Sequence, residues 1–177
     1  MDRNLGATQV ATSSIDANSY GDLYQWGRRS DGHQCRTSLT TATLSSVDQP
    51  ANGDFITINS GNYDWRIPQN DNLWQGVNGI NNPCPSGYRL PTETEINNER
   101  LSWSTNNTAG AFASPLKLPN AGNRGSIGML FSIGNGGVYW SSTVNGTDAY
   151  FLTFTSSNSV IIDDARAFGR SVRCIKD

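Results

Sequence analysis

The sequence predicts an α+β domain in which two helices pack on a small twisted antiparallel sheet with long loops. Three observations point to this class. Two short segments before residue 102 carry helix-capping residues, the stretch 28–83 is rich in loop-forming residues, and the part after 117 alternates short strand-like runs with glycines. No linker, repeat or low-complexity segment divides the 177 residues, so we expect one domain over 1–177.

The segment SYGDLYQWGRR, 19–29, predicts the first helix. Ser19 is a suitable N-cap residue. Tyr20, Leu23 and Tyr24 follow at spacings that place them on one helical face, where they would contact the core. Gly27 can adopt the left-handed conformation that ends a helix. We therefore expect a helix that begins after Ser19 and ends near Gly27.

The segment that follows NPCPSGYRLP predicts the second helix. Thr92 and Glu95 have the spacing of a capping box, in which each side chain accepts a hydrogen bond from the backbone of the other residue. Ile96 and Leu101 are expected to face inward on a helix of about two to three turns.

Short strands are predicted in the rest of the chain. Between the two helices, 54–58 is expected to form one weak strand within a long loop. After the second helix, glycine turns separate the predicted strands, which lie around 117–122, 126–134, 138–143, 149–154 and 170–176.

The charge and hydropathy of the chain bear on the kind of partner. The net charge is −2 at pH 7, whereas nucleic-acid binding needs a basic face. No apolar run approaches the roughly 18 residues of a membrane span. We expect neither nucleic acid nor direct membrane insertion. Met1 is followed directly by Asp2 and Arg3 rather than by a signal peptide, so we expect the chain to begin within a longer protein.

The three cysteines, Cys35, Cys84 and Cys174, do not have the spacing of a zinc or redox motif, and His33 is the only histidine. Cys84 lies just before the second helix and Cys174 ends the last predicted strand. A disulfide between them is one interpretation, and three reduced thiols in a reducing compartment is the other. Cys35 stays unpaired in both.

The segment from Tyr150 to Cys174 combines strand-like ends with an irregular middle. Between Ser156 and Arg170 the apolar residues follow neither a period of 2 nor a period of 3.6. Local folding rules do not explain such a passage, so we interpret it as a surface selected for contact. Alternation in AYFLTF places Leu152 and Phe154 on one face and the residues between them on the other.

This interpretation predicts a display segment at about 141–175 in which some positions are buried and others exposed. The residues expected to be buried, because they hold its ends to the sheet, are Leu152, Phe154, Val172 and Cys174. The residues expected to bind a ligand on one exposed face are Phe151, Thr153, Thr155, Asn158, Ile162, Asp163, Asp164, Ala167, Phe168 and Arg170. The alternative is that Phe151, Phe168, Ile161 and Ile162 are core residues under a long loop.

Several fragments resemble, in the same order, the Fibrobacter succinogenes major paralogous domain. They are DRNLGAT, SYGDLYQWGR, NPCPSGYRLPTETE, SPLKLPNAG, VYWSST and GRSVRCIKD, which together extend from Asp2 to Asp177. The resemblance implies a C-type-lectin-like fold, similar also to that of formylglycine-generating enzymes. It further implies an exported or surface protein, which favours oxidation of Cys84 with Cys174.

A subset of that family resembles the variable proteins of diversity-generating retroelements, in which a reverse transcriptase rewrites adenines in a C-terminal segment. Such segments start near a YWSST and end at an SVRC, as Tyr139–Thr143 and Ser171–Cys174 do here. Rewriting of AAC or AAT codons never gives Glu, Lys, Gln, Met or Trp, and residues 141–175 contain none of these five. The resemblance therefore implies a non-enzymatic ligand-binding module with a hypervariable recognition surface.

For the partner, the resemblance implies a protein or glycan ligand on another cell or particle. For localisation, it implies an extracellular position, at a cell surface or a virion surface. We expect no cofactor. Two groups, Asp163-Asp164 and Asn70-Asp71-Asn72, contain oxygen ligands that suit calcium, but solvated turn residues are the preferred interpretation. We expect no catalytic metal site.

Two alternative functions belong to other classes. An enzyme of the formylglycine-generating type needs two closely placed reactive cysteines near the C-terminal part, where only Cys174 lies. His33, near Cys35, is better interpreted as part of a polar turn than as catalytic. The other alternative is a structural or adhesive domain of a surface protein without a tight ligand. We therefore predict no catalytic residues.

Overall fold

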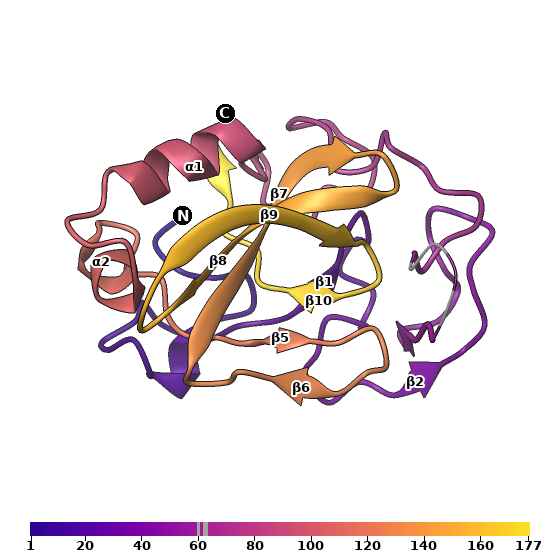
Figure 1. Ribbon diagram of the computed structural model, residues 1–177. Coiled ribbons are helices and arrows are strands. Elements are labelled where there is room, and N and C mark those ends of the chain that lie inside the picture. Colours follow the sequence, from indigo (N-terminus) through magenta and orange to yellow (C-terminus); the bar gives the residue numbers. More distant parts are fainter. Residues whose placement is uncertain (60, 62–63) are drawn as a thin grey trace.

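The structure is a computed structural model that describes residues 1–59, 61 and 64–177. Over these residues it is an α+β fold with two α-helices and several small sheets (Figure 1). The helical elements are η1, a 3-10 turn (Ala17–Ser19), α1 (Glu93–Leu101) and α2 (Thr108–Ala113). The strands are β1 (Tyr24–Gln25), β2 (Thr40–Thr41), β3 (Phe55–Ile56), β4 (Tyr88–Arg89), β5 (Asn123–Arg124), β6 (Leu130–Phe131), β7 (Gly136–Asn145), β8 (Asp148–Thr155), β9 (Ser159–Ala165), β10 (Gly169–Arg170) and β11 (Ile175–Lys176).

The longest strands form the antiparallel sheet β7-β8-β9, with β8 in the centre. Its register pairs Trp140 with Phe151 and Phe151 with Ile162. Gly146 has a φ of 57° at the start of the two-residue β7–β8 loop, a position that favours glycine in tight hairpins. Strand β9 lies at the edge and crosses the front of the molecule in Figure 1.

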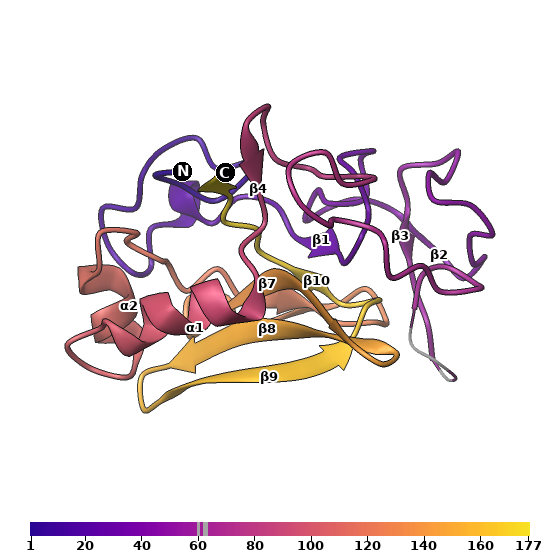
Figure 2. The ribbon, with the colours of Figure 1, turned by 90° about the horizontal axis from the view of Figure 1, so that it is seen from above.

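Both faces of this sheet are covered, but by different parts of the chain. On one face, Leu152 and Phe154 pack in an apolar cluster with Ile96 of α1. Figure 2 shows α1 lying over that face. On the other face, Trp140 and Phe151 belong to a second cluster built from the N-terminal part and the long loops. Because side chains alternate along a strand, β8 contributes to both clusters at once.

A second sheet connects the two ends of the chain, with the order β1-β10-β5-β6. Tyr24 of β1 pairs with Arg170 of β10, and Gly169 pairs with Arg124 of β5. A Cβ atom at Gly169 would lie 2.9 Å from the Phe55 ring and 3.0 Å from the Arg124 Cβ, so the close approach of these strands requires glycine. The termini are also close, since the Met1 ammonium donates to the Cys174 carbonyl at 2.7 Å.

The helix predicted after NPCPSGYRLP is confirmed as α1, and its capping box is present. The Thr92 side chain accepts from the Glu95 backbone, and the Glu95 carboxylate accepts from the Thr92 backbone at 2.8 Å. Arg89 also binds the carboxylate and is the main reason that the pKa of Glu95 falls to about 2. Ile96 is buried as predicted, but Leu101 is 65% exposed. Five residues separate the two, which rotates Leu101 by about 140° around the helix.

The helix predicted over 19–29 is wrong. Only the short turn η1 lies nearby, capped by Asp16 rather than Ser19, and the chain then extends into β1. Gly21 has a φ of 64°, which interrupts a right-handed helix. Leu23 and Tyr24 are buried as expected, but Leu23 lies in the extended chain before β1, and Tyr24 pairs with β10. Long-range pairing thus overrides the local helical spacing.

The strand predictions are met unevenly. The weak strand at 54–58 is present as β3, which pairs in parallel with an unpredicted β2. The strands expected near 138–143 and 149–154 correspond to β7 and β8, whereas the one expected at 117–122 begins later, as β5. Helix α2 and strand β9 were not predicted. Strand β9 lies within the passage that we interpreted as irregular. Its alternation is hard to detect in the sequence because three apolar residues, Val160, Ile161 and Ile162, are consecutive.

Cys84 and Cys174 are joined by a disulfide, with a Cα–Cα distance of 5.9 Å and 90 residues of sequence separation. Cys174 is fully buried, whereas Cys35 is a free, exposed thiol. The disulfide ties the segment before α1 to the end of the chain and so closes the loop that contains both helices and the three-stranded sheet.

Replacing both bridging cysteines by alanine should lower the free energy of unfolding by about 4 kcal/mol. The disulfide closes a long loop and so reduces the chain entropy of the unfolded state, and this stabilisation of the folded state is lost without it. Urea unfolding of the oxidised wild type and of the double variant measures the difference. Cys35→Ala is the matched control and should leave the midpoint unchanged. Equal stability of the double variant and the wild type would contradict the structural role of the bridge.

Candidate binding surface

The display residues predicted on one exposed face divide into three groups. Thr155, Asn158, Ile162 and Asp163 are exposed, and Thr153, Asp164 and Phe168 are half-buried. Phe151, Ala167 and Arg170 are buried, which corrects the prediction for these three. The four residues expected to hold the ends, Leu152, Phe154, Val172 and Cys174, are all fully buried.

Cross-strand pairing shows which of these side chains share a face. Partners directly opposite each other in an antiparallel ladder point to the same side of a sheet. Thr153 pairs with Val160, and Phe151 pairs with Ile162. We call the accessible part of this face the β9 surface and define it as Thr153, Thr155, Asn158, Val160, Ile162 and Asp164. Asp163 pairs with Tyr150 and points to the other side.

Phe151 is buried because the sheet is covered on both faces. Its ring meets that of Trp140 edge to face, with centroids 5.8 Å apart. The Arg170 guanidinium carbon lies 3.4 Å from the Phe151 ring centroid and 4.1 Å from that of Trp140. The alternation along β8 thus correctly predicts the face on which Phe151 lies. Arg170 of β10 covers part of that face, so Phe151 is buried instead of exposed.

Arg170 links this buried layer to the β9 surface. Its Nη2 donates to the Asp164 carboxylate at 2.6 Å, and burial lowers the pKa of Arg170 to about 9. Neither Nε nor Nη1 of Arg170 has a partner among the described residues. The stacked guanidinium holds Asp164 in a fixed place at the margin of the β9 surface, where that carboxylate stays partly accessible.

The oxygen groups considered as calcium ligands are otherwise engaged. Asp164 binds Arg170, and Asp163 accepts from the Asn145 side chain at 3.3 Å. Asp71 binds Arg166 at 2.6 Å. Within residues 1–59, 61 and 64–177, no group of three or more His, Cys, Asp or Glu side chains is placed to hold a metal ion.

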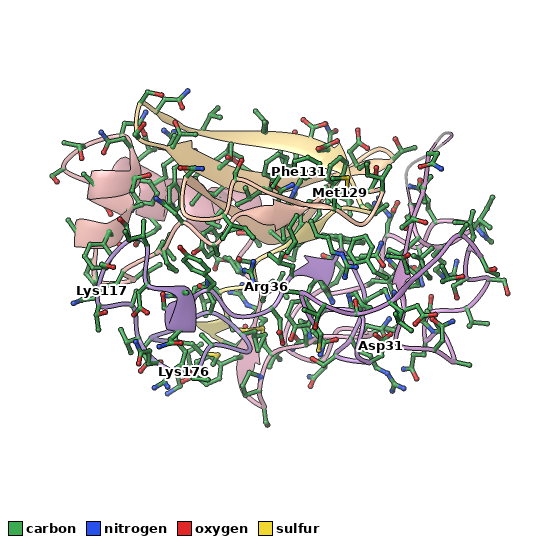
Figure 3. The ribbon with its side chains drawn as sticks, turned by 90° about the horizontal axis from the view of Figure 1, so that it is seen from below. Asp31, Arg36, Lys117, Met129, Phe131 and Lys176 are labelled. Carbon is green, nitrogen blue, oxygen red and sulfur yellow. A yellow bond between two sulfur atoms is a disulfide. The ribbon has the colours of Figure 1, made fainter. Side chains whose placement is uncertain are left out.

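A second set of exposed apolar side chains lies around β6 and was not predicted. Figure 3 shows Met129 and Phe131 close together on the underside of the molecule, which is the side turned away from α1. Phe131 is 44% exposed and Met129 58%. On the β9 surface, Val160 is 38% and Ile162 44% exposed. In the sequence, the exposed strand β6 corresponds to the apolar run Met129-Leu130-Phe131. A buried strand between glycine turns would show the same kind of run, so the pattern does not indicate that these side chains are exposed.

Aromatic and histidine side chains that suggest sugar stacking or catalysis have structural roles. All five tryptophans are buried. His33 is also fully buried, with one ring nitrogen 2.6 Å from the Asp31 carboxylate and the other accepting from the Gln25 backbone. Burial lowers the pKa of His33 to about 4, so the ring is neutral at physiological pH. This explains His33 as a core hydrogen-bonding residue.

Comparisons of the chain with known protein families, with curated proteins and with solved structures find no match. The resemblance to the major paralogous domain and to C-type-lectin-like proteins therefore stays a prediction. Neither helix in the described part of the chain has the length and apolarity needed to cross a bilayer.

The split between buried and exposed positions can be tested by alanine substitution. Leu152→Ala and Phe151→Ala should each lower the free energy of unfolding by about 2–5 kcal/mol, because each leaves a cavity in one of the two apolar clusters. Ile162→Ala should lower it by a smaller amount, about 1 kcal/mol, since its side chain is 44% exposed. Chemical unfolding measures all three. A loss at Ile162 as large as that at Leu152 would show that the β9 surface belongs to the core.

Proposed function

We propose that this domain is a non-enzymatic ligand-binding module of the C-type-lectin-like type, and that its recognition surface is the β9 surface. The observation that carries the proposal is the exposure of Val160 and Ile162 on an edge strand whose neighbour, β8, is buried on both faces. Such a strand is held rigidly, yet its outer side chains are free to contact a partner.

The energetics of the sheet support a recognition role for these positions. Leu152 and Phe154 are fully buried, so substitutions there reduce stability strongly. Substitutions at exposed positions such as Val160 and Ile162 do not create closed cavities, and their effect on stability is smaller. A surface of this kind can change its specificity while the fold is kept, as a diversified protein requires. Phe151, Ala167 and Arg170 fall outside the changeable set, because all three are buried.

The chemistry of the surface suits a protein or glycan ligand. Val160 and Ile162 supply apolar contact, Thr153 supplies a hydroxyl, and Asp164 supplies a carboxylate at the margin. Exposed apolar side chains near polar ones are typical of contact sites. A polyanion such as nucleic acid is disfavoured by this carboxylate and by the net charge of −2.

Two further observations support a binding module at a cell or particle surface over an enzyme of the formylglycine-generating type. Cys174, the cysteine that such chemistry would need, is fully buried and bonded to Cys84. Disulfides of this kind persist in oxidising compartments. The lectin-like assignment is supported by the motif resemblance and by the observed α+β fold, with helices on a twisted sheet and a long loop region.

Binding of the labelled wild type to a glycan array and to intact bacterial cells tests the proposal. The double substitution Val160→Asp and Ile162→Asp should abolish the signal, because it places two charges in the contact. The matched control is Leu101→Asp, which changes an exposed leucine of α1 on the other side of the sheet. It should retain binding, and both variants should melt within a few degrees of the wild type.

Two results would count against the proposal. Wild type that binds neither the array nor any cell type would favour a structural domain without a tight ligand. Binding that survives the double substitution but is lost in Leu101→Asp would place the recognition surface on the helical side.

A further inference from the structure

A pocket of about 330 Å³ lies on the helical side of the three-stranded sheet, away from the β9 surface. One wall is α1, and the opposite wall is formed by the chain at Leu116–Leu118 and by β11. Pockets that bind small molecules have volumes of roughly 300–1,000 Å³. The pocket is therefore large enough for a compact organic ligand.

The floor of the pocket is apolar and well ordered by packing. Ile96, Leu118 and Tyr139 line it and are buried. The Tyr139 hydroxyl, which is the polar atom of this floor, donates to the Pro119 carbonyl at 2.9 Å. Leu116 and Ile175 line the pocket nearer the solvent and are half-buried. A ligand with an apolar body would remove the exposed parts of Leu116 and Ile175 from water, which is favourable in proportion to the area covered.

The charged groups around the pocket differ in how fully they are engaged. Arg173 uses Nε and Nη2 on the Asn4 side chain and Nη1 on the Leu116 carbonyl. Glu95 binds Arg89 through both carboxylate oxygens. Glu99 accepts one hydrogen bond, from the Trp103 indole at 3.1 Å, and forms no ion pair with any residue that the structure describes.

Glu99 is thus the charged group with capacity for a ligand. Its carboxylate is half-exposed at the pocket lining, where it can accept further hydrogen bonds. Glu95 is paired with Arg89, and every nitrogen of Arg173 already donates to Asn4 or Leu116, so the free charged hydrogen-bonding capacity at the lining is the acceptor of Glu99, which suits a cationic donor rather than an anion. The acceptor at the lining and the apolar floor together define a ligand with an apolar body and a positively charged head.

We propose that this pocket binds a small organic amine, with an aromatic or aliphatic body against Ile96, Leu118 and Tyr139 and its ammonium group at Glu99. The site is separate from the proposed recognition surface and does not depend on it. The two proposals can therefore fail independently.

Tryptamine is the probe, compared with its neutral analogue tryptophol and its anionic analogue indole-3-acetate in ¹H–¹⁵N NMR titrations of the full chain. We expect tryptamine to shift the backbone amides of Ile96, Leu118 and Arg173. Its Kd should be about three- to fivefold lower than that of tryptophol, because a partly exposed ion pair adds this much to binding. Indole-3-acetate should bind more weakly than both.

Two variants separate the roles of charge and cavity. Glu99→Gln keeps the acceptor for Trp103 and should raise the tryptamine Kd about three- to fivefold while leaving tryptophol unchanged. Glu93→Gln, on the same helix but outside the pocket, is the control for net charge and should change neither. Leu116→Trp should fill the pocket and abolish binding of both compounds, with retained dispersion of the NMR spectrum showing that it folds.

Absence of shifts at the pocket amides with about 5 mM tryptamine would overturn the proposal. So would indole-3-acetate that binds as tightly as tryptamine, or an identical tryptamine Kd in Glu99→Gln and wild type. These last two results remain decisive if Leu116→Trp does not fold.

Discussion

The rest of the structure depends on the burial of strand β8 on both faces. Leu152 and Phe154 pack against the helical side, while Phe151 packs against Trp140 and the N-terminal part of the chain. A central strand buried in this way leaves the three-stranded sheet few free surfaces. The accessible part of the face away from the helices is the β9 surface, and the helical face carries the pocket beside α1. The positions of both candidate sites are therefore set by which parts of the sheet the two apolar clusters leave uncovered.

Buried arginines cover aromatic rings of the core where loops rather than regular elements pack against it. Arg170 stacks on Phe151, Arg166 lies over Trp26, and Arg124 lies over Phe55. A planar guanidinium can cover an aromatic ring with its face while its edge donates to backbone carbonyls and carboxylates. Arg124 does this for the loop at 35–38 through bonds to the Cys35 and Ser38 carbonyls. Loops poor in apolar residues are thereby joined to the core.

The sequence could predict features that depend on near neighbours. The capping box at Thr92 and the alternation within β8 rest on residues a few positions apart, and both are present. Features that depend on distant partners were missed. The segment 19–29 has helical spacing but pairs as β1 with β10. Phe151 and Arg170 looked free for contact because nothing local shows that they stack on each other. Exposure in the display segment is therefore set by which distant element covers each face.

Native-state hydrogen exchange tests the central role of β8 most directly. If both clusters close on this strand, the amides of Phe151 to Phe154 can open only when the whole domain unfolds, so their opening free energy should equal the global free energy of unfolding. The amides of edge strand β9 that point away from β8 should exchange much faster. Exchange of the β8 amides by local opening, well below the global value and with α1 still protected, would contradict the account.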